Sequence, residues 1–559
     1  MQIMMKKSQN VPRIVIPSAT LVPEELWTLG KLPGIVYPIN QRIVFDYLYE
    51  QYKDFDIDVI CYEQAEKVQR RLEKYINNSV RIRVLDTLSD LGHSVYFALR
   101  DVSEPVIINF ADTIVMDDIS ALIGTDAFYC HEDYMSETWT YFDEENGRIT
   151  NIYDKKSIDS DKKKKLFVGV FSITDSEYFR KCLEEAFAQK ELSMSTFYFA
   201  LRRYSEKNPM KAVTTENWFD IGHQDKYYNS KLEVRAREFN HITVDKNRGI
   251  LRKSSDDKDK FIGEIKWYLK LPKDIEYVSP RIFDYSTSYD DPYVSMEYYS
   301  YHTLHELFLY GDLERQQWVD IFNRIRFVCD DFKRYTVKDE NIQPSLEEMY
   351  LTKTIQRLDK LKKDERFHCF FERSITVNGK EYVSLDQVIR LLKKLIPAEL
   401  YDVENFTIIH GDLCFSNIMV DSNLSFIKVI DPRGKFGAYD LYGDQRYEMA
   451  KLFHSVDGKY DYIIKELFDV AFDPDSVTLT YQIHEKKNSF NLYKVFVETF
   501  REEIGGDGRK IELIESLLFL SMIPLHNESF KQQLVMLCTG LDILNRVADI
   551  TTSGVEKDV

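Results

Sequence analysis

Short apolar runs alternate with stretches of helical periodicity through the first 235 residues of the chain. Four runs rich in β-branched residues predict buried strands, at residues 12–19, 57–63, 81–86 and 105–115. Between them, apolar residues fall at helical spacing, for example Ile43, Tyr47 and Leu48. This alternation indicates a largely parallel sheet covered by helices, in which ligands bind at the carboxyl ends of the strands.

The pattern changes after residue 235. Residues 239–255 alternate apolar and polar positions around the turn DKNRG and predict a hairpin, with Lys253 on its second strand. The following pattern predicts a helix at residues 260–272, strands at 281–286 and 292–299, and long helices through 315–400. In the first of these helices, Glu264 is placed to face the strand of Lys253. A small β lobe with one helix is therefore expected to precede a helical region.

Composition places the chain among globular proteins of two or three domains. It has 559 residues, of which 44% are hydrophobic and 30% charged, and no run approaches the length of a membrane span. Lys and Arg number 74 against 92 Asp and Glu, a net charge of −18 that disfavours nucleic acid and anionic lipid as partners. The first residues lack a cleavable hydrophobic segment, so a cytoplasmic location and a small-molecule partner are expected. The oligomeric state is not indicated.

The cysteines show no pattern typical of disulfides or of a metal site. There are seven, an odd number, and no two form a CxxC pair. This argues against both a set of disulfides and a zinc site.

Candidate chemistry in the first region begins at Asp112, which follows the buried run VIINFA. A carboxylate at the end of such a strand can hold a metal or a ribose, although a capping Asp at a strand end is also common. A later strand, GRITNIYD, is followed by Lys155 and Lys156, and the sequence Trp218-Phe219-Asp220-Ile221-Gly222 comes further on. Two carboxylates and a cation are the groups needed to neutralise two polyanions that must react.

This ordered set resembles the nucleotidyltransferases that activate sugar phosphates and related phosphorylated alcohols, over most of residues 10–235. The resemblance implies a Rossmann-like, GT-A-like α/β core. It also implies that Asp112 and Asp220 hold Mg²⁺, that Lys155 meets the substrate phosphate, and that Leu91-Gly92-His93-Ser94 is a small-residue turn at the base and sugar.

The chain departs from this family at the triphosphate loop. The family has a glycine-rich loop here, followed by a Pro-Lys pair, whereas this chain has Pro17-Ser18-Ala19-Thr20-Leu21-Val22-Pro23-Glu24-Glu25 and then Pro33-Gly34. Prolines lack the N–H groups that wrap a phosphate. The first region is therefore expected to be either a working transferase or a degenerate one that only binds a nucleotide or regulates.

The second region contains a motif with phosphoryl-transfer spacing. His410-Gly411-Asp412 is followed after four residues by Asn417, and Asp431 stands after the apolar run FIKVI. In this layout Asp412 would accept the proton of an attacking hydroxyl, while Asn417 and Asp431 would hold Mg²⁺ on the ATP phosphates. The alternative is a polar loop with a capping Asp that matches by chance.

The region resembles the kinase-like phosphotransferases of aminoglycosides, choline and other small alcohols, over residues 235–540. The resemblance implies an α+β bilobal domain, with a small β lobe at 236–300 and a helical large lobe at 301–559, after a transferase-like domain at 1–235. It further implies that Lys253 meets the α- and β-phosphates, that Glu264 orients Lys253, and that Met296 and Glu297 belong to the nucleotide site. No Ala-Pro-Glu segment is present, which disfavours a protein substrate.

Other residues of this region receive structural interpretations. Asp444 is expected to be a helix N-cap, and Cys414 a buried spacer within the loop. The acceptor pocket must come from the helical remainder, whose candidates include Tyr442, Tyr447, Tyr481 and Tyr493.

Together the two regions predict a bifunctional enzyme. The second would phosphorylate a small alcohol or sugar with ATP, and the first would transfer a nucleotidyl group from CTP or UTP to the product with release of pyrophosphate. Such an enzyme would supply an activated precursor for a surface or capsular polysaccharide. The alternatives are a small-molecule kinase with a degenerate transferase-like domain, and a pseudokinase scaffold.

Overall fold

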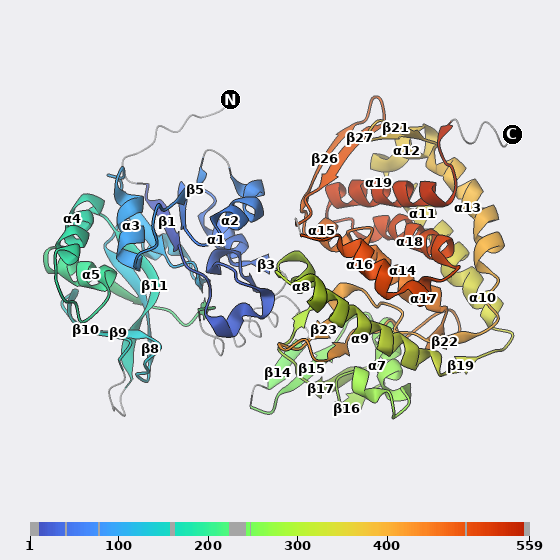
Figure 1. Cartoon of the computed structure of the whole chain (residues 1–559), viewed down its shortest axis with the longest axis horizontal. Helices are drawn as coiled ribbons and strands as arrows, with labels where there is room; N and C mark the ends of the chain where they lie inside the picture. The colour runs from blue at the N-terminus through green and yellow to red at the C-terminus, as the bar shows by residue number, and fades with distance from the viewer. Residues whose placement is uncertain are drawn as a thin grey trace. The chain divides into compact units, whose positions relative to one another are not determined.

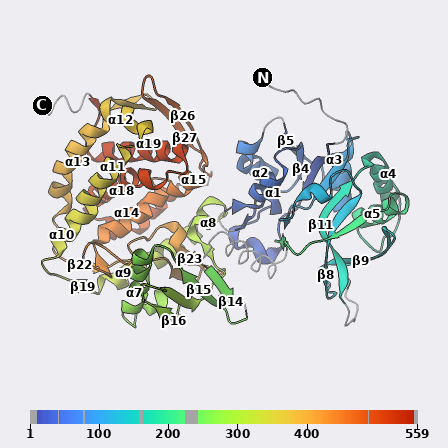
Figure 2. The same ribbon diagram turned by 180° about the vertical axis from the view of Figure 1, so that it is seen from behind.

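The structure is a computed structural model that describes residues 11–39, 42–76, 79–156, 163–222, 242–245, 247–486 and 489–552. The chain divides into two compact units, residues 1–238 and 239–559 (Figures 1 and 2). The boundary predicted at residues 235 and 236, and the first residues of the predicted hairpin, lie outside the described residues. Within the described ranges, no helix combines the length and the apolar character that a membrane crossing would need.

The N-terminal unit contains a sheet with a parallel half. Its strands are β1 (Arg13–Ser18), β4 (Ile57–Cys61), β5 (Val80–Val84) and β6 (Val106–Asn109), paired in the order β6-β1-β4-β5. The helices in this part are α1 (Val44–Tyr52), α2 (Ala65–Arg71) and α3 (Leu91–Leu99). Because β4 and β6 flank β1 on opposite sides, the strand order reverses at β1, as in Rossmann-like folds. Ligands of such sheets bind at the carboxyl ends of the two strands where this reversal occurs.

The other half of the sheet is antiparallel, so the prediction of a largely parallel sheet is wrong there. Strand β11 (Lys164–Ile173) runs antiparallel to β6, β8 (Ala127–Asp133) and β9 (Thr140–Glu145). Strand β10 (Arg148–Asp154) pairs with β9, and β12 (Lys211–Thr214) with β8. Apolar composition reports that a strand is buried, but it does not report the direction of the strand.

Helices α4 (Ser176–Phe187) and α5 (Thr196–Lys207) pack on this half of the sheet, over an aromatic core (Figure 1). Phe142 and Phe167 stack with ring centroids 4.4 Å apart, Phe128 contacts both rings edge-to-face, and Phe171 links Phe167 to Phe197. Edge-to-face contacts are among the arrangements that aromatic pairs prefer.

The turn predicted at Leu91-Gly92-His93-Ser94 is instead the first turn of helix α3. Asp90 caps the helix, since its side chain accepts a hydrogen bond from the His93 N–H at 3.1 Å. An Asp followed by apolar residues at helical spacing is a helix start, and this local signal outweighs the family resemblance at these residues.

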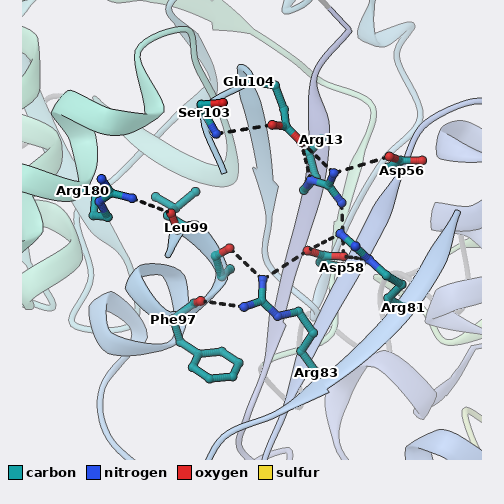
Figure 3. A network of polar contacts seen from close by, with 11 residues as sticks. Arg13, Asp56, Asp58, Arg81, Arg83, Phe97, Leu99, Ser103, Glu104 and Arg180 are labelled. Carbon is teal, nitrogen blue, oxygen red and sulfur yellow. Dashed lines mark hydrogen bonds and ion pairs between the residues drawn. The ribbon is translucent and has the colours of Figure 1, made fainter. Parts of the chain in front are cut away.

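A buried carboxylate, Asp58 of β4, ties three strands together (Figure 3). Arg81 of β5 donates to both of its oxygens, at 2.9 and 3.2 Å. Arg83 of β5 donates to Oδ2 at 3.4 Å, and Nη1 of Arg13 on β1 lies 3.5 Å from Oδ1. Arg83 also donates to the Ala98 carbonyl at the end of α3. The carboxylate therefore links β4 to β5 through charged hydrogen bonds and to β1 through an ion pair, and Arg83 extends the network to α3.

The C-terminal unit begins with a four-stranded antiparallel sheet and one helix. The sheet order is β14 (Ile242–Asp245), β15 (Ile250–Ser254), β17 (Tyr293–Glu297) and β16 (Ile282–Ser286), and the helix is α7 (Lys258–Lys270). The strands and the helix predicted for this stretch are confirmed. Apolar residues of α7, including Phe261, Ile265 and Trp267, are buried.

The rest of this unit is mainly helical, with three small sheets (Figure 2). Its helices are α8 (Leu304–Leu309), α9 (Arg315–Lys333), α10 (Ile342–Leu346), the π-helix η6 (Glu347–Thr352), α11 (Lys353–Leu361), α12 (His368–Glu372), α13 (Leu385–Leu400), α14 (Gln445–Val456), α15 (Tyr460–Ile464), α16 (Leu492–Thr499), α17 (Arg501–Ile504), α18 (Gly508–Met522) and α19 (Phe530–Val547). Helix α18 lies in the core between α14 and α19.

The strands of this part are β18 (His302–Thr303), β23 (Ile418–Val420) and β24 (Ile427–Val429) in one sheet, β19 (Thr336–Val337), β22 (Phe406–Ile408) and β25 (Tyr442–Gly443) in the second, and β20 (Ile375–Val377), β21 (Lys380–Tyr382), β26 (Phe468–Asp473) and β27 (Thr478–Ile483) in the third. Strands β19, β20 and β21 interrupt the stretch predicted to be helical at 315–400. Tyr481 lies on β27 rather than on a helix.

Candidate active sites

The loop between β22 and β23 carries Asp412 and Asn417 and brings their side chains together. The Asn417 side-chain amide donates to the Asp412 carbonyl at 2.9 Å and to its Oδ2 at 3.2 Å. His410 stabilises the loop from inside: its Nε2 contacts the Ile430 carbonyl at 3.0 Å, and its Nδ1 accepts from the Asp412 N–H at 3.3 Å. Burial lowers the pKa of His410 to about 4, so the ring is neutral and serves as a structural element of the loop.

The sequence did not point to Lys451, which contacts the carboxylate of Asp412. Its Nζ, on helix α14, lies 2.9 Å from Asp412 Oδ1, and its side chain is buried. Burial alone would raise the pKa of Asp412, but Lys451, with His410 and Arg433, holds that pKa well below its ordinary value. Asp412 is therefore an ionised carboxylate. The signal available was its place on the helix that Asp444 caps, seven residues after that cap.

Two predicted structural roles near this loop are confirmed. Asp444 caps α14 by accepting from the Arg446 N–H at 2.9 Å. Cys414 is buried, and burial raises the pKa of its thiol to about 12, which leaves it unreactive. Glu448, on the same helix as Lys451, accepts hydrogen bonds from the N–H groups of His410 and Gly411 at 3.0 and 2.6 Å. The helix thus holds the loop through its backbone as well as through Lys451.

Lys253, Glu264 and Asp431 meet although they come from three different segments. The Lys253 Nζ lies 2.8 Å from Glu264 Oε1 and 2.7 Å from Asp431 Oδ1. Burial alone would lower the pKa of Lys253, but the charges of Asp431 and Glu264 raise it. Burial, and then the charge of Asp431, raise the pKa of Glu264 to about 7. A cation thus stands between two carboxylates at the position expected for the phosphates of a nucleotide.

Helix α7 is positioned by a close approach to the segment after Asp431. A Cβ on Gly434, whose φ is +65°, would lie 2.1 Å from the carbonyl carbon of Gly263 on α7. The Trp267 indole of the same helix donates to the Ile409 carbonyl at 2.7 Å. Asp431 itself has a φ of +57°, and its N–H donates to the Tyr268 hydroxyl at 3.0 Å. This left-handed conformation, unusual for a non-glycine residue, sets the direction of the Asp431 carboxylate.

A cavity of about 1100 Å³ in the C-terminal unit is lined by five of the predicted residues, Lys253, Glu264, Asp412, Asn417 and Asp431. Of the tyrosines proposed for the acceptor site, Tyr447 lines this cavity. Tyr442, Tyr481 and Tyr493, all described, do not. Met296 and Glu297 are also described and are not among the lining residues; the Glu297 carboxylate accepts instead from the Tyr299 hydroxyl at 2.6 Å.

The residues available for Mg²⁺ in this cavity are Asn417 and Asp431. An amide and a carboxylate offer the oxygen ligands that Mg²⁺ takes, and this ion is often bound by one or two such groups together with phosphates and water. Among the described residues there is no group of three or more His, Cys, Asp or Glu that could form a complete protein cage for a metal. The donor set therefore fits a metal shared with a nucleotide, which is how ATP carries Mg²⁺.

In the N-terminal unit, Asp112 and Asp220 converge beyond the end of β6. Strand β13 (Trp218–Asp220) pairs with β7 (Thr113–Val115), and the Ile221 N–H donates to the Asp112 carbonyl at 2.9 Å. A Cβ on Gly222 would lie 2.6 Å from Asp112 Oδ2 and 3.1 Å from Asp220 Oδ1. Both carboxylates thus flank one glycine, at the sheet edge where the strand order reverses. Paired carboxylates of this kind fit Mg²⁺.

Lys155 lies one residue beyond β10, exposed and with a φ of +51°. Burial raises the pKa of the Tyr198 hydroxyl. The negative charges of Asp154, which precedes Lys155, and of Asp112 raise this pKa further. The end of β10 and the Asp112 turn therefore border the same tyrosine.

Backbone N–H groups of the segment after β1 donate hydrogen bonds to other parts of the N-terminal unit. The Leu21 N–H donates to the carboxylate of Glu63 at 3.0 Å, and the Val22 N–H donates to the Leu32 carbonyl at 2.9 Å. The 3₁₀ helix η1 (Glu24–Leu29) buries Leu26 and Leu29. Where a glycine-rich loop would direct N–H groups toward a triphosphate, this loop uses two of them internally and holds a carboxylate beside them. This arrangement differs from that of a glycine-rich phosphate-binding loop.

Comparisons with known proteins were made for the whole chain. No family model and no curated protein sequence matches it. Structural neighbours over the N-terminal part, about 40% of the chain, are nucleotidyltransferases. They include a CTP:phosphocholine cytidylyltransferase from Streptococcus pneumoniae (16% identity, 40% of this chain and 99% of that chain, TM-score 0.34). An inositol-1-phosphate CTP transferase from T. maritima has 14% identity, covers 40% of this chain and 97% of that chain, and has a TM-score of 0.33. A UDP-glucose pyrophosphorylase has 14% identity, covers 41% of this chain and 99% of that chain, and has a TM-score of 0.34. The TM-scores of these neighbours are below 0.5, so the neighbours do not indicate the activity of this chain.

One prediction concerns His454, a buried histidine of α14. Its ring stacks on Tyr460 at 4.1 Å, and neither ring nitrogen has a hydrogen-bond partner among the described residues. Burial, followed by the charge of Lys451, holds the pKa of His454 well below 6.5, its ordinary value. Between those two pKa values the unfolded chain binds more protons than the folded one. The stability gained from the neutral ring is therefore complete above pH 6.5 and is lost as the pH falls.

We therefore expect His454→Phe to change how stability depends on pH. The loss of unfolding free energy between pH 7 and pH 5 should be smaller in the variant than in the unsubstituted chain, as measured by urea unfolding. The exposed His368 provides the surface control, with His368→Gln measured in the same way. Equal losses in His454→Phe and the unsubstituted chain would contradict a buried neutral ring.

Proposed function

We propose that the C-terminal unit is a kinase that transfers the γ-phosphoryl group of ATP to the hydroxyl of a small molecule. The observation that supports this most is the convergence of Lys253, Glu264, Asp412, Asn417 and Asp431 on one cavity. A four-stranded sheet with one helix on one side, and a helical region on the other, is also the arrangement of a kinase-like bilobal fold.

In this proposal the ionised Asp412 orients the acceptor hydroxyl and accepts its proton as the oxygen attacks the γ-phosphorus. A new O–P bond forms, the bond from the γ-phosphorus to the β-phosphate oxygen breaks, and ADP leaves. Lys253, held by Glu264, neutralises the remaining phosphates. Asn417 and Asp431 would hold Mg²⁺, which would supply positive charge to neutralise those phosphates.

For the N-terminal unit we propose nucleotidyl transfer, in which an oxygen of the phosphorylated product attacks the α-phosphorus of CTP or UTP and pyrophosphate leaves. The pairing of Asp112 and Asp220 at the sheet edge supports this reaction. The two reactions in sequence would make an activated precursor of the kind that surface or capsular polysaccharides consume.

A second candidate keeps the kinase and assigns the N-terminal unit a binding or regulatory role. The segment after β1, with Glu63 against the Leu21 N–H, favours it. The third alternative, a pseudokinase scaffold, requires that the phosphoryl-transfer residues have no catalytic function. Nothing in the cavity favours this hypothesis.

One mass-spectrometric experiment tests the kinase and the transferase together. The purified chain is incubated with Mg²⁺, ATP, one of CTP, UTP, GTP or dTTP, and a panel of alcohols, sugars and their phosphates. We expect a nucleotide-linked product that needs an intact Asp412 when the alcohol is supplied, but not when its phosphate is supplied. Phosphorylation without a nucleotide-linked product would favour the regulatory role, and no phosphorylation at all would favour the scaffold.

Asp112→Ala and Asp220→Ala separate the two units. Each should lower the yield of nucleotide-linked product by at least about 100-fold, because each removes a carboxylate that would hold Mg²⁺ at the polyanionic transition state. ATP-dependent phosphorylation should be unchanged. Asp101→Ala removes an exposed carboxylate elsewhere in the same unit and serves as the control. Unchanged product in both variants would show that the transferase assignment is wrong.

A further inference from the structure

The cavity of the C-terminal unit extends past Asp412 into a zone rich in cations. Lys353, Arg357, Arg433 and Lys451 all line it. Arg433 donates to the Tyr447 hydroxyl at 2.7 Å, and Arg357 contacts the Ser521 carbonyl and hydroxyl, both at 3.4 Å. These partners are neutral, so the hydrogen bonds hold the guanidinium groups in place without cancelling their charge.

The side chain of Lys353 makes no hydrogen bond and no ion pair with any residue in the part of the chain that the structure describes. Burial, followed by the charges of Arg433, Arg357 and Lys451, lowers the pKa of Lys353 to about 6, and the charge of Asp412 opposes this. Burial and Arg433 likewise lower the pKa of Arg357. Because Asp412 is already paired with Lys451 at 2.9 Å, the positive charge of the zone comes from Arg357 and Arg433, whose hydrogen-bond partners are neutral.

Most of the other acidic residues of the cavity are engaged by neighbouring groups. Glu264 and Asp431 contact Lys253, Asp257 caps helix α7, and Asp440 pairs with Lys270. Asp259 is exposed in the first turn of α7. The cation zone is bordered instead by apolar side chains of α18, including Leu517, Leu518 and Met522.

The backbone places Lys353 in this zone through an unusual element. The π-helix η6 ends at Thr352, and α11 begins at Lys353. Residues Met349 and Tyr350 of η6 line the cavity together with Lys353 and Arg357. π-helical turns inside helices are rare and frequently mark functional sites, since they redirect side chains that a regular helix would turn away.

We propose that the phosphoryl acceptor is an alcohol that carries an anionic group, a carboxylate or a phosphate, bound by Lys353, Arg357 and Arg433. This rests on the kinase activity proposed above. With its anionic group held there and its carbon chain against α18, the acceptor presents a hydroxyl to Asp412. A cationic acceptor would meet the guanidinium groups of Arg357 and Arg433, while Asp412 is already paired with Lys451, so an amino alcohol or a quaternary ammonium alcohol is disfavoured.

The test compares acceptors that differ only in charge. Glycerol, glycerate, glycerol 1-phosphate and 3-amino-1,2-propanediol are each assayed for ADP release with the full chain, ATP and Mg²⁺, together with six-carbon analogues of the same four charge types. We expect kcat/KM for the carboxylate or the phosphate member to exceed that of the neutral member by about 10- to 100-fold, the effect of one charged hydrogen-bonding group, and the amine to be inert. The two anionic arms decide between carboxylate and phosphate.

Variants then locate the effect. Lys353→Met and Arg357→Met should each raise KM for the anionic acceptor by about 10-fold or more while KM for ATP stays unchanged. Lys360→Met, an exposed lysine on the same helix, is the matched control. A rise in KM for ATP instead would assign the cations to the nucleotide and overturn the proposal. The substrate comparison needs no variant and decides the matter if a variant fails to fold.

The outcomes separate this proposal from the one beneath it. Phosphorylation that prefers the neutral or the amino alcohol would leave the kinase standing and overturn the anionic acceptor. No phosphorylation of any member, with any charge, would overturn the kinase itself and this proposal with it.

Discussion

Replacing Asp412 by asparagine is expected to lower kcat for ATP-dependent phosphorylation by about 10²- to 10⁴-fold. The variant keeps the size of the side chain but loses the carboxylate that orients the hydroxyl and accepts its proton. KM for ATP should change little, because Lys253, Asn417 and Asp431 remain. The measurement is steady-state ADP release with the best acceptor of the panel.

The substitution has a second effect that must be kept apart from catalysis. It leaves the buried ammonium of Lys451 without its partly exposed carboxylate, and a buried charge without a partner is destabilising. The double variant Asp412→Asn with Lys451→Met removes both charges and should recover stability without recovering activity. Asp386→Asn, which breaks an exposed pair with Lys362, is the surface control. Activity within 10-fold of the unsubstituted chain in Asp412→Asn would refute the assigned role.

Asp58→Asn is expected to produce the largest loss of stability in the N-terminal unit, about 3–5 kcal/mol of unfolding free energy. Asp58 is fully buried and binds Arg81, Arg83 and Arg13 (Figure 3), so its loss leaves three guanidinium groups without their shared carboxylate. Asparagine keeps the shape but can accept through one oxygen only. Urea unfolding of the full chain, followed by a probe in each unit, should show the shift in the N-terminal unit alone.

Asp56 provides the matched control for this network. It pairs with Arg13 at 3.4 Å, but its side chain is 33% exposed. Exposed ion pairs contribute roughly 0–1 kcal/mol, so Asp56→Asn should have a small effect. If both variants lose the same free energy, burial of Asp58 is not what makes the network stabilising.

The sequence predicted element types well, because apolar periodicity follows burial directly. The strands at β1, β4, β5 and β6 and the helix α7 all lie where the pattern placed them. Strand direction was not predictable: β11 is as apolar as a parallel strand, yet it runs antiparallel to β6. Direction depends on the connection between strands, and a local pattern carries no record of it.

The candidate sites show the same division. Asp412, Asn417 and Asp431 stand in one short stretch at a fixed spacing, so sequence alone could group them. Lys451 of helix α14 contacts Asp412, and Lys353 of helix α11 lines the same cavity, only through tertiary packing. A lone lysine on an amphipathic helix looks like any surface lysine, and nothing in its neighbours along the chain marks it as buried.

The number of residues in η6 determines which side chains of α11 line the cavity. Residues of an α-helix advance by about 100° each, and a π-turn accommodates one residue more than an α-turn. Removing one residue from Glu347–Thr352 would therefore rotate α11 by about 100° about its axis. Lys353 and Arg357 would leave the cavity, and Leu358 and Leu361 would leave the core. A single-residue deletion in η6 would therefore remove two basic side chains from the cavity.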